Sequence, residues 1–209
     1  MRLPLWLKIV WTLWLLVWAP LYWKYYGAQN FLFFCDIGNI VIGIALWSES
    51  ALLFSWQAVG LLVFQTLYAI DLVGQLILGR HFIGGTEYMF DASLPLLQRM
   101  LSLFHVLTPP LLLWAIRRVG YDPRGWTLQT ITCWGVVTIN YFWRPAADIN
   151  FARGLFFREQ HVVPGFLYLV AYFIIVPLAI YYPTHLFLQK WARERIREKA
   201  TADPELRSG

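Results

Sequence analysis

Residues 51–70 read ALLFSWQAVGLLVFQTLYAI and contain no charged side chain. A helix needs about 20 apolar residues to cross the roughly 30 Å hydrocarbon core of a bilayer, so this stretch is long enough to span one. The whole chain agrees, since 59% of its 209 residues are hydrophobic and 14% are charged, whereas soluble domains have about 45–50% and about 25%. The sequence therefore predicts an integral membrane protein and excludes a cytosolic enzyme, a disordered chain and a collagen-like chain.

Counting apolar segments of this kind predicts an all-α, polytopic membrane bundle of six transmembrane helices. The first has no small-residue cleavage site after it, which favours a retained helix over a signal peptide. The third exceeds one bilayer thickness, which predicts a tilt. We divide the chain into a six-helix domain at residues 1–188 and a charged tail at residues 189–209. The expected spans are residues 5–22, 30–47, 51–79, 94–116, 126–143 and 164–188.

The positions of lysine and arginine predict the orientation in the membrane. The tail after residue 188 is rich in both, and the short loop after the fourth span carries Arg117, Arg118 and Arg124. Cytoplasmic loops carry such an excess, so we expect both termini in the cytoplasm. Short loops and the lack of targeting signals favour a multi-pass protein of the bacterial inner membrane. The basic residues behind the net charge of +5 lie at the ends of apolar segments, so we interpret them as signals of membrane orientation. We predict membrane lipids as partners and no nucleic acid, and the sequence leaves protein partners unknown.

Polar residues inside the spans gather in the non-cytoplasmic half when they are placed by depth, at about 1.5 Å per residue. Such residues are costly in lipid and are therefore expected to face the bundle interior. This convergence predicts a pocket that is open to water or to substrate. The residues are Cys35, Asp36 and Asn39 in the second span, Asp71 in the third, Ser102 and His105 in the fourth, and Asn140 in the fifth.

Cys35 and His105 are the pair whose chemistry suits such a pocket. An imidazole can accept the thiol proton and so prepare the sulfur for acyl transfer or ester hydrolysis. The alternative is ordinary packing, as expected for Cys133. Successive helix residues lie about 100° apart, so we expect Asp36 to point away from the thiol.

Three further expectations concern charged residues. Asp71 is predicted to be neutral or paired, with Arg80 and Arg99 as candidate partners. His81, Glu87 and Asp91 could hold a metal, but their spacing matches no metal signature, so neither metal nor cofactor is predicted. The guanidinium groups of Arg144, Arg153 and Arg158 could bind an anionic headgroup or serve as interfacial anchors.

Short motifs resemble YwaF-type bacterial integral membrane proteins. Asn30-Phe-Leu-Phe-Phe-Cys35-Asp-Ile is similar to their Leu-His-Leu-Cys helix, although Phe33 stands where they have histidine. Leu101-Ser-Leu-Phe-His105 is similar to their Ser-His helix with one residue inserted, and Asp148-Ile-Asn150-Phe to their Thr-Asn-Tyr loop. That family is similar to eukaryotic transmembrane Cys–His acyltransferases and, more distantly, to androgen-induced Thr–His lipid hydrolases. The resemblance implies Cys35 as nucleophile, His105 as base and Asn150 as a pocket residue.

Three classes of function therefore remain open. The first is a lipid acyltransferase or ester hydrolase that uses Cys35 and His105. The second is a transporter or a binding protein for a lipid or small molecule, and the third is a structural assembly partner whose polar residues hold helices together.

Overall fold

The computed structural model describes residues 3–143, 148–155 and 159–202, with side chains up to residue 194. Within these ranges the chain is helical, with no strand. Each expected span overlaps one helix or one continuous helical rod. These are α1 (Leu5–Tyr26), α2 (Phe34–Ser48), α3 (Ala51–Leu78), α4 (Leu96–Met100) continued by η3 (Leu101–Leu103) and α5 (Phe104–Val119), α6 (Arg124–Trp143), and α7 (Gly165–Val176) continued by η7 (Pro177–Tyr181) and α8 (Tyr182–Ala202). However, α2 begins only at Phe34, and the last rod continues beyond residue 188 to Ala202.

Four of these rods, among the described residues, are long and apolar enough to cross a membrane: Leu5–Tyr26, Ala51–Leu78, Leu96–Val119 and Gly165–Glu194. The chain is therefore an all-helical membrane protein. With 15 residues, α2 is about 22 Å long, shorter than a bilayer core. The 20 residues of α6 include Arg124, Gln129 and Asn140, which lower its hydropathy. Six spans and the position of the termini thus stay predictions.

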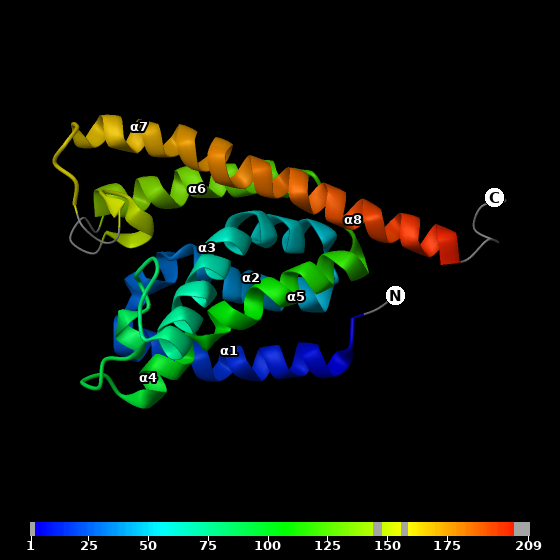
Figure 1. Ribbon diagram of the computed structural model, residues 1–209, viewed down its shortest axis with the longest axis horizontal. Coiled ribbons are helices and arrows are strands. Elements are labelled where there is room, and N and C mark those ends of the chain that lie inside the picture. Colours follow the sequence, from blue (N-terminus) through cyan, green and yellow to red (C-terminus); the bar gives the residue numbers. More distant parts are fainter. Residues whose placement is uncertain (1–2, 144–147, 156–158, 203–209) are drawn as a thin grey trace.

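The bundle is built around α3, which packs against α2, α5, α6 and α8, while α1 lies against α2. Figure 1 shows the start of α1 and the end of α8 at the same end of the molecule. The connections from α3 to α4 and from α6 to α7 lie at the opposite end. Apolar side chains from α2, α3, α5 and α6 form the buried core, including Ile42, Phe54, Leu112 and Val137.

The last rod contains a π turn, η7, where Pro177 interrupts the helix. Proline has no backbone N–H, so the carbonyl of Phe173, four residues earlier, loses its usual donor. The indole Nε1 of Trp134 on α6 donates to this carbonyl at 3.0 Å. The indole of Trp134 thereby supplies the hydrogen bond to the Phe173 carbonyl that Pro177 cannot donate.

Candidate functional site

A cavity of about 350 Å³ lies between α1, α2, α3 and α5 and collects most of the polar residues expected in the non-cytoplasmic half. Cys35 and Asp36 enter it from the first turn of α2, and Ser102 and His105 from the junction of η3 and α5. Four of the expected site residues thus line one space. The other lining residues are Tyr22, Tyr26, Asn30, Phe33, Tyr68, Gly85 and Tyr88.

The ring of His105 is held in one orientation. Its Nδ1 lies 2.7 Å from the carbonyl oxygen of Ser102. A carbonyl can only accept, so Nδ1 carries the proton, and in the neutral ring Nε2 is the unprotonated nitrogen. The ring stacks on Tyr68, with the ring centroids 4.6 Å apart. His105 therefore presents a nitrogen that can accept a proton from a group in the cavity.

The thiol of Cys35 contacts Asp36 and not His105. Its Sγ lies 3.6 Å from Asp36 Oδ1, and Asn30 Nδ2 donates to Asp36 Oδ2 at 2.6 Å. The expectation that Asp36 points away from the thiol is wrong. The carboxylate accepts a hydrogen bond from Asn30 in the preceding turn, and this bond holds it at the start of α2, beside Cys35. In the described part of the chain, no hydrogen bond joins Cys35 to His105, although both line the cavity.

Four tyrosines give the cavity a wall of hydroxyl groups that the sequence analysis missed. The hydroxyls of Tyr22 and Ser102 are 3.0 Å apart, and those of Tyr68 and Tyr88 are 2.8 Å apart. Burial is the main cause that raises the pKa of Tyr88, and the neighbouring Tyr68 raises it further. The hydroxyl of Tyr88 therefore stays protonated and can act as a donor. The spacing of Tyr22 and Tyr26 on one face of α1 was the available signal, but aromatic residues in membrane proteins are usually interfacial.

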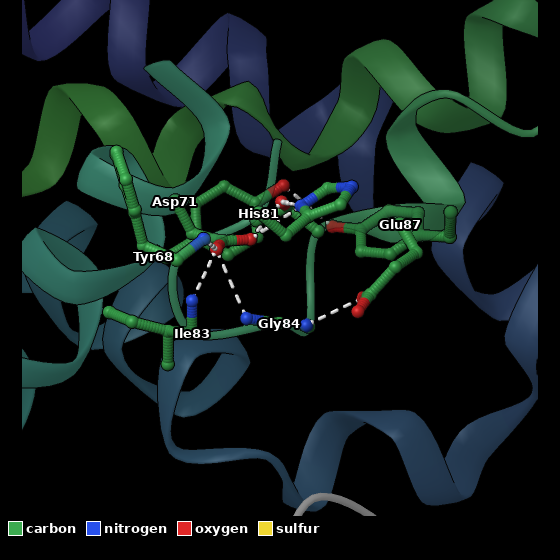
Figure 2. A network of polar contacts seen from close by, with 10 residues as sticks. Tyr68, Asp71, His81, Ile83, Gly84 and Glu87 are labelled. Carbon is green, nitrogen blue, oxygen red and sulfur yellow. Dashed lines mark hydrogen bonds and ion pairs between the residues drawn. The ribbon is translucent and has the colours of Figure 1, made fainter. Parts of the chain in front are cut away.

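Asp71 lies beside the cavity, where it binds the loop that follows α3 (Figure 2). Its Oδ1 accepts hydrogen bonds from the backbone N–H groups of Phe82 at 2.8 Å, Ile83 at 2.8 Å and Gly84 at 3.0 Å. The carboxylate is completely buried. We name this arrangement the Asp71 cage.

The other oxygen of Asp71 completes the cage. His81 Nδ1 lies 2.9 Å from Oδ2, and the hydroxyl of Thr86 donates to the same atom. The predicted partners Arg80 and Arg99 were wrong: Arg80 lies over the ring of Phe82, and Arg99 donates to the carbonyl of Met89. The cage fixes the loop whose Gly85 lines the cavity.

Asn150 does not line the cavity but holds the start of α2. Its Oδ1 accepts from the backbone N–H of Phe34 at 3.0 Å, and its Nδ2 donates to the carbonyl of Leu32 at 2.7 Å. The first N–H groups of a helix have no partner within the helix, so this side chain caps α2 from a distant loop. Asn150 thereby positions the turn that carries Cys35 and Asp36.

The remaining predicted residues also lie outside the cavity. Asn39 and Asn140 are buried, and neither amide has a hydrogen-bond partner within the described residues. Arg153 donates to the carbonyl of Tyr141 at 2.8 Å and to Glu159 at 3.2 Å. Arg144 and Arg158 lie outside the described residues. Depth in the membrane was predicted, but depth does not determine which side of a helix faces the cavity.

Comparisons of the chain with family models, with curated proteins and with solved structures give no match. The candidate site therefore rests on the geometry of this molecule.

Proposed function

We propose that the chain crosses the bacterial inner membrane six times, with both termini in the cytoplasm. The basic residues at the end of α5, at the start of α6 and in the second half of α8 support this orientation, as does the common end of the bundle at which α1 begins and α8 ends (Figure 1). Reporter fusions at Gly120 and at residue 209 should both report the cytoplasm. An active periplasmic reporter at Gly120 would overturn the proposed depth of the cavity.

We further propose that the cavity is the active site of a membrane enzyme that transfers or hydrolyses an acyl group of a lipid ester. One observation carries the proposal: a thiol and a histidine of fixed tautomer line the same cavity. Cysteine is the strongest nucleophile available there, and Nε2 of His105 is the acceptor that the ring leaves open.

The proposed reaction has two half-reactions. His105 Nε2 takes the proton of Cys35, and Sγ attacks the ester carbonyl carbon; the bond to the alcohol oxygen then breaks, and the alcohol leaves with the proton from His105. The acyl group is held on Cys35 as a thioester. Water or a second alcohol, deprotonated by His105, attacks the thioester and releases Cys35 as a thiol. The tyrosine hydroxyls in the cavity are available donors for the oxyanion.

Labelling with a lipid-like electrophile tests this proposal, because the chain has a second free cysteine as an internal control. Cys35→Ala should abolish labelling and any esterase activity, whereas Cys133→Ala should leave both unchanged. His105→Gln should slow labelling of Cys35, while His185→Gln, outside the cavity, should not. Equal labelling of both cysteines, unaffected by His105→Gln, contradicts the enzymatic proposal.

One observation favours a second candidate, a protein that binds a lipid or small molecule without reacting with it. The hydrogen-bond partner of Cys35 is Asp36, which is acidic, and a neighbouring negative charge opposes formation of a thiolate. A lipid that binds the purified chain equally well before and after Cys35→Ala, with no turnover by either, would support this second candidate.

A further inference from the structure

Asp36 is a buried carboxylate whose hydrogen-bond partners carry no positive charge. Its oxygens accept from the amide of Asn30 at 2.6 Å and from the thiol of Cys35 at 3.6 Å. The residue is 1% exposed, and it forms no ion pair within the described part of the chain. A buried charge is costly unless it is paired. The carboxylate therefore needs a proton or a cation from outside the chain to balance it.

The cavity beside Asp36 supplies no such cation. Its lining includes no lysine or arginine among the residues that the structure describes. Its histidine, His105, places the Nδ1 proton on the carbonyl of Ser102 and leaves Nε2 as an acceptor in the neutral ring. A carboxylate offers about four lone-pair sites, and the two bonds to Asp36 leave some of them free. A ligand in the cavity can therefore pair with Asp36.

The other hydrogen-bonding groups of the cavity are mostly acceptors. The hydroxyls of Tyr22 and Ser102 lie 3.0 Å apart, and those of Tyr68 and Tyr88 lie 2.8 Å apart. In each pair one hydroxyl donates to the other, so the pair keeps more acceptor sites than donors. Together with Asp36, these oxygens favour a ligand that donates several hydrogen bonds from one atom.

Aromatic rings surround this group of acceptors. The face of such a ring is negative and attracts a cation. The rings also exclude water, which strengthens the attraction between a cation and a carboxylate. The tyrosines that line the cavity are Tyr22, Tyr26, Tyr68 and Tyr88.

We propose that the cavity binds a primary ammonium group, with Asp36 as its counter-ion. An N–H of the ammonium group donates to the carboxylate, and the others donate to hydroxyl oxygens of the lining. Nε2 of His105 stays available for the proton transfer proposed above. The inference rests on the proposed function for the place of the ligand and names its class, but it does not require a reaction at Cys35. A lipid headgroup and a free amine both offer this chemistry.

Native mass spectrometry of the full chain in non-ionic detergent micelles, titrated with dodecylamine, tests this proposal. Two probes with the same alkyl chain are the comparisons: dodecan-1-ol has no charge, and dodecyltrimethylammonium has the charge but no N–H donor. The parent chain should bind dodecylamine at least about tenfold more tightly than either probe, because hydrogen bonds to charged groups are the strong ones.

Variants of the chain locate the site. Asp36→Asn should bind dodecylamine about tenfold more weakly than the parent. The matched control Asp148→Asn removes a carboxylate from the loop between α6 and α7, outside the cavity, and should bind like the parent. Cys35→Ala should bind at least as tightly as the parent, whether or not the chain is an enzyme. A failure of this proposal is therefore distinguishable from a failure of the proposed acyl transfer.

Competition against dodecylamine separates the two sources of the ammonium group. Displacement by phosphatidylethanolamine assigns the group to a lipid headgroup, and displacement by free ethanolamine assigns it to a soluble amine. Equal weakening by Asp148→Asn would overturn the proposal, since only net charge would then matter. Equal binding of dodecan-1-ol or of dodecyltrimethylammonium would also overturn it. If Asp36→Asn does not fold, the comparison of the three probes on the parent chain gives the decision.

Discussion

Asp71 and Asp36 are both buried carboxylates, yet their surroundings differ. Asp71 has five hydrogen-bond partners, three on Oδ1 and two on Oδ2. Asp36 has two, Asn30 and Cys35. A carboxylate offers about four lone-pair sites. The lone pairs of Asp71 are therefore all occupied by hydrogen bonds within the protein. Asp36 lines the cavity and can still accept further hydrogen bonds there.

This difference separates a structural acid from one that is available to a ligand. Both are polar residues within apolar helices, and both were predicted for the same pocket. Only the count of partners distinguishes them, and that count depends on the loop after α3 and on the turn before α2.

The largest effect is expected from Asp71→Leu. This substitution leaves three backbone N–H groups, Thr86 and His81 without their acceptor, and breaking a buried polar cluster of this kind costs about 3–5 kcal/mol. Thermal unfolding in detergent micelles should show a large loss of the free energy of unfolding, together with poor recovery of folded protein. An unchanged melting temperature would refute the structural role of the cage.

Asn150→Ala should have the next largest effect. It removes the bonds to Phe34 and Leu32, and loss of a helix cap costs about 0.5–2 kcal/mol. Asn150→Asp keeps an acceptor for Phe34 but loses the donor to Leu32, so its cost should lie between those of the parent and the alanine variant. Hydrogen exchange at the first turn of α2 provides a local measurement, and exchange there should become faster in the alanine variant first.

Asp36→Asn should change the stability by less than about 1 kcal/mol, since the amide oxygen can still accept from Asn30 and the amide nitrogen can donate to the sulfur of Cys35, a weak acceptor. The matched substitution Asp71→Asn should cost more, because the amide nitrogen cannot accept from Thr86. Parallel unfolding curves of these two variants compare the carboxylates directly. A larger loss for Asp36→Asn than for Asp71→Asn would reverse the assignment of roles.

The smallest effect concerns Asp148, in the loop between α6 and α7. Burial raises the pKa of Asp148 above its ordinary value of 3.8, so the folded state favours the protonated form. The resulting stabilisation is present below the ordinary pKa and is lost as pH rises through the raised pKa. Stability should therefore fall slightly as pH rises through this window, and Asp148→Asn should flatten that part of the pH profile.

The helices were predictable because each rests on a long apolar segment, and the breaks at Gly27, Ser50 and Gly120 follow from polar or glycine residues. Cys35, Asp36, Ser102 and His105 were predicted for one pocket and line one cavity. Asn39 and Asn140 were predicted for the same pocket and do not line it, because depth does not determine which side of a helix faces the cavity. The Asp71 cage was not predictable, since its donors are backbone groups of Phe82, Ile83 and Gly84, which any sequence carries. Asn150 was assigned to the pocket through resemblance, but its bonds make it a cap.

The π turn at Pro177–Tyr181 determines which way the side chains of α8 face around the helix axis. Such a turn accommodates one residue more than an α-helix would in the same length. If the same residues wound as an ordinary α-helix, α8 would rotate by about 100° about its axis. His185 would then leave Tyr121, now 2.6 Å from it, and Trp191 would leave Arg117. The direction in which the charged end of α8 faces is thus set about two and a half turns before its first charged residue, Lys190.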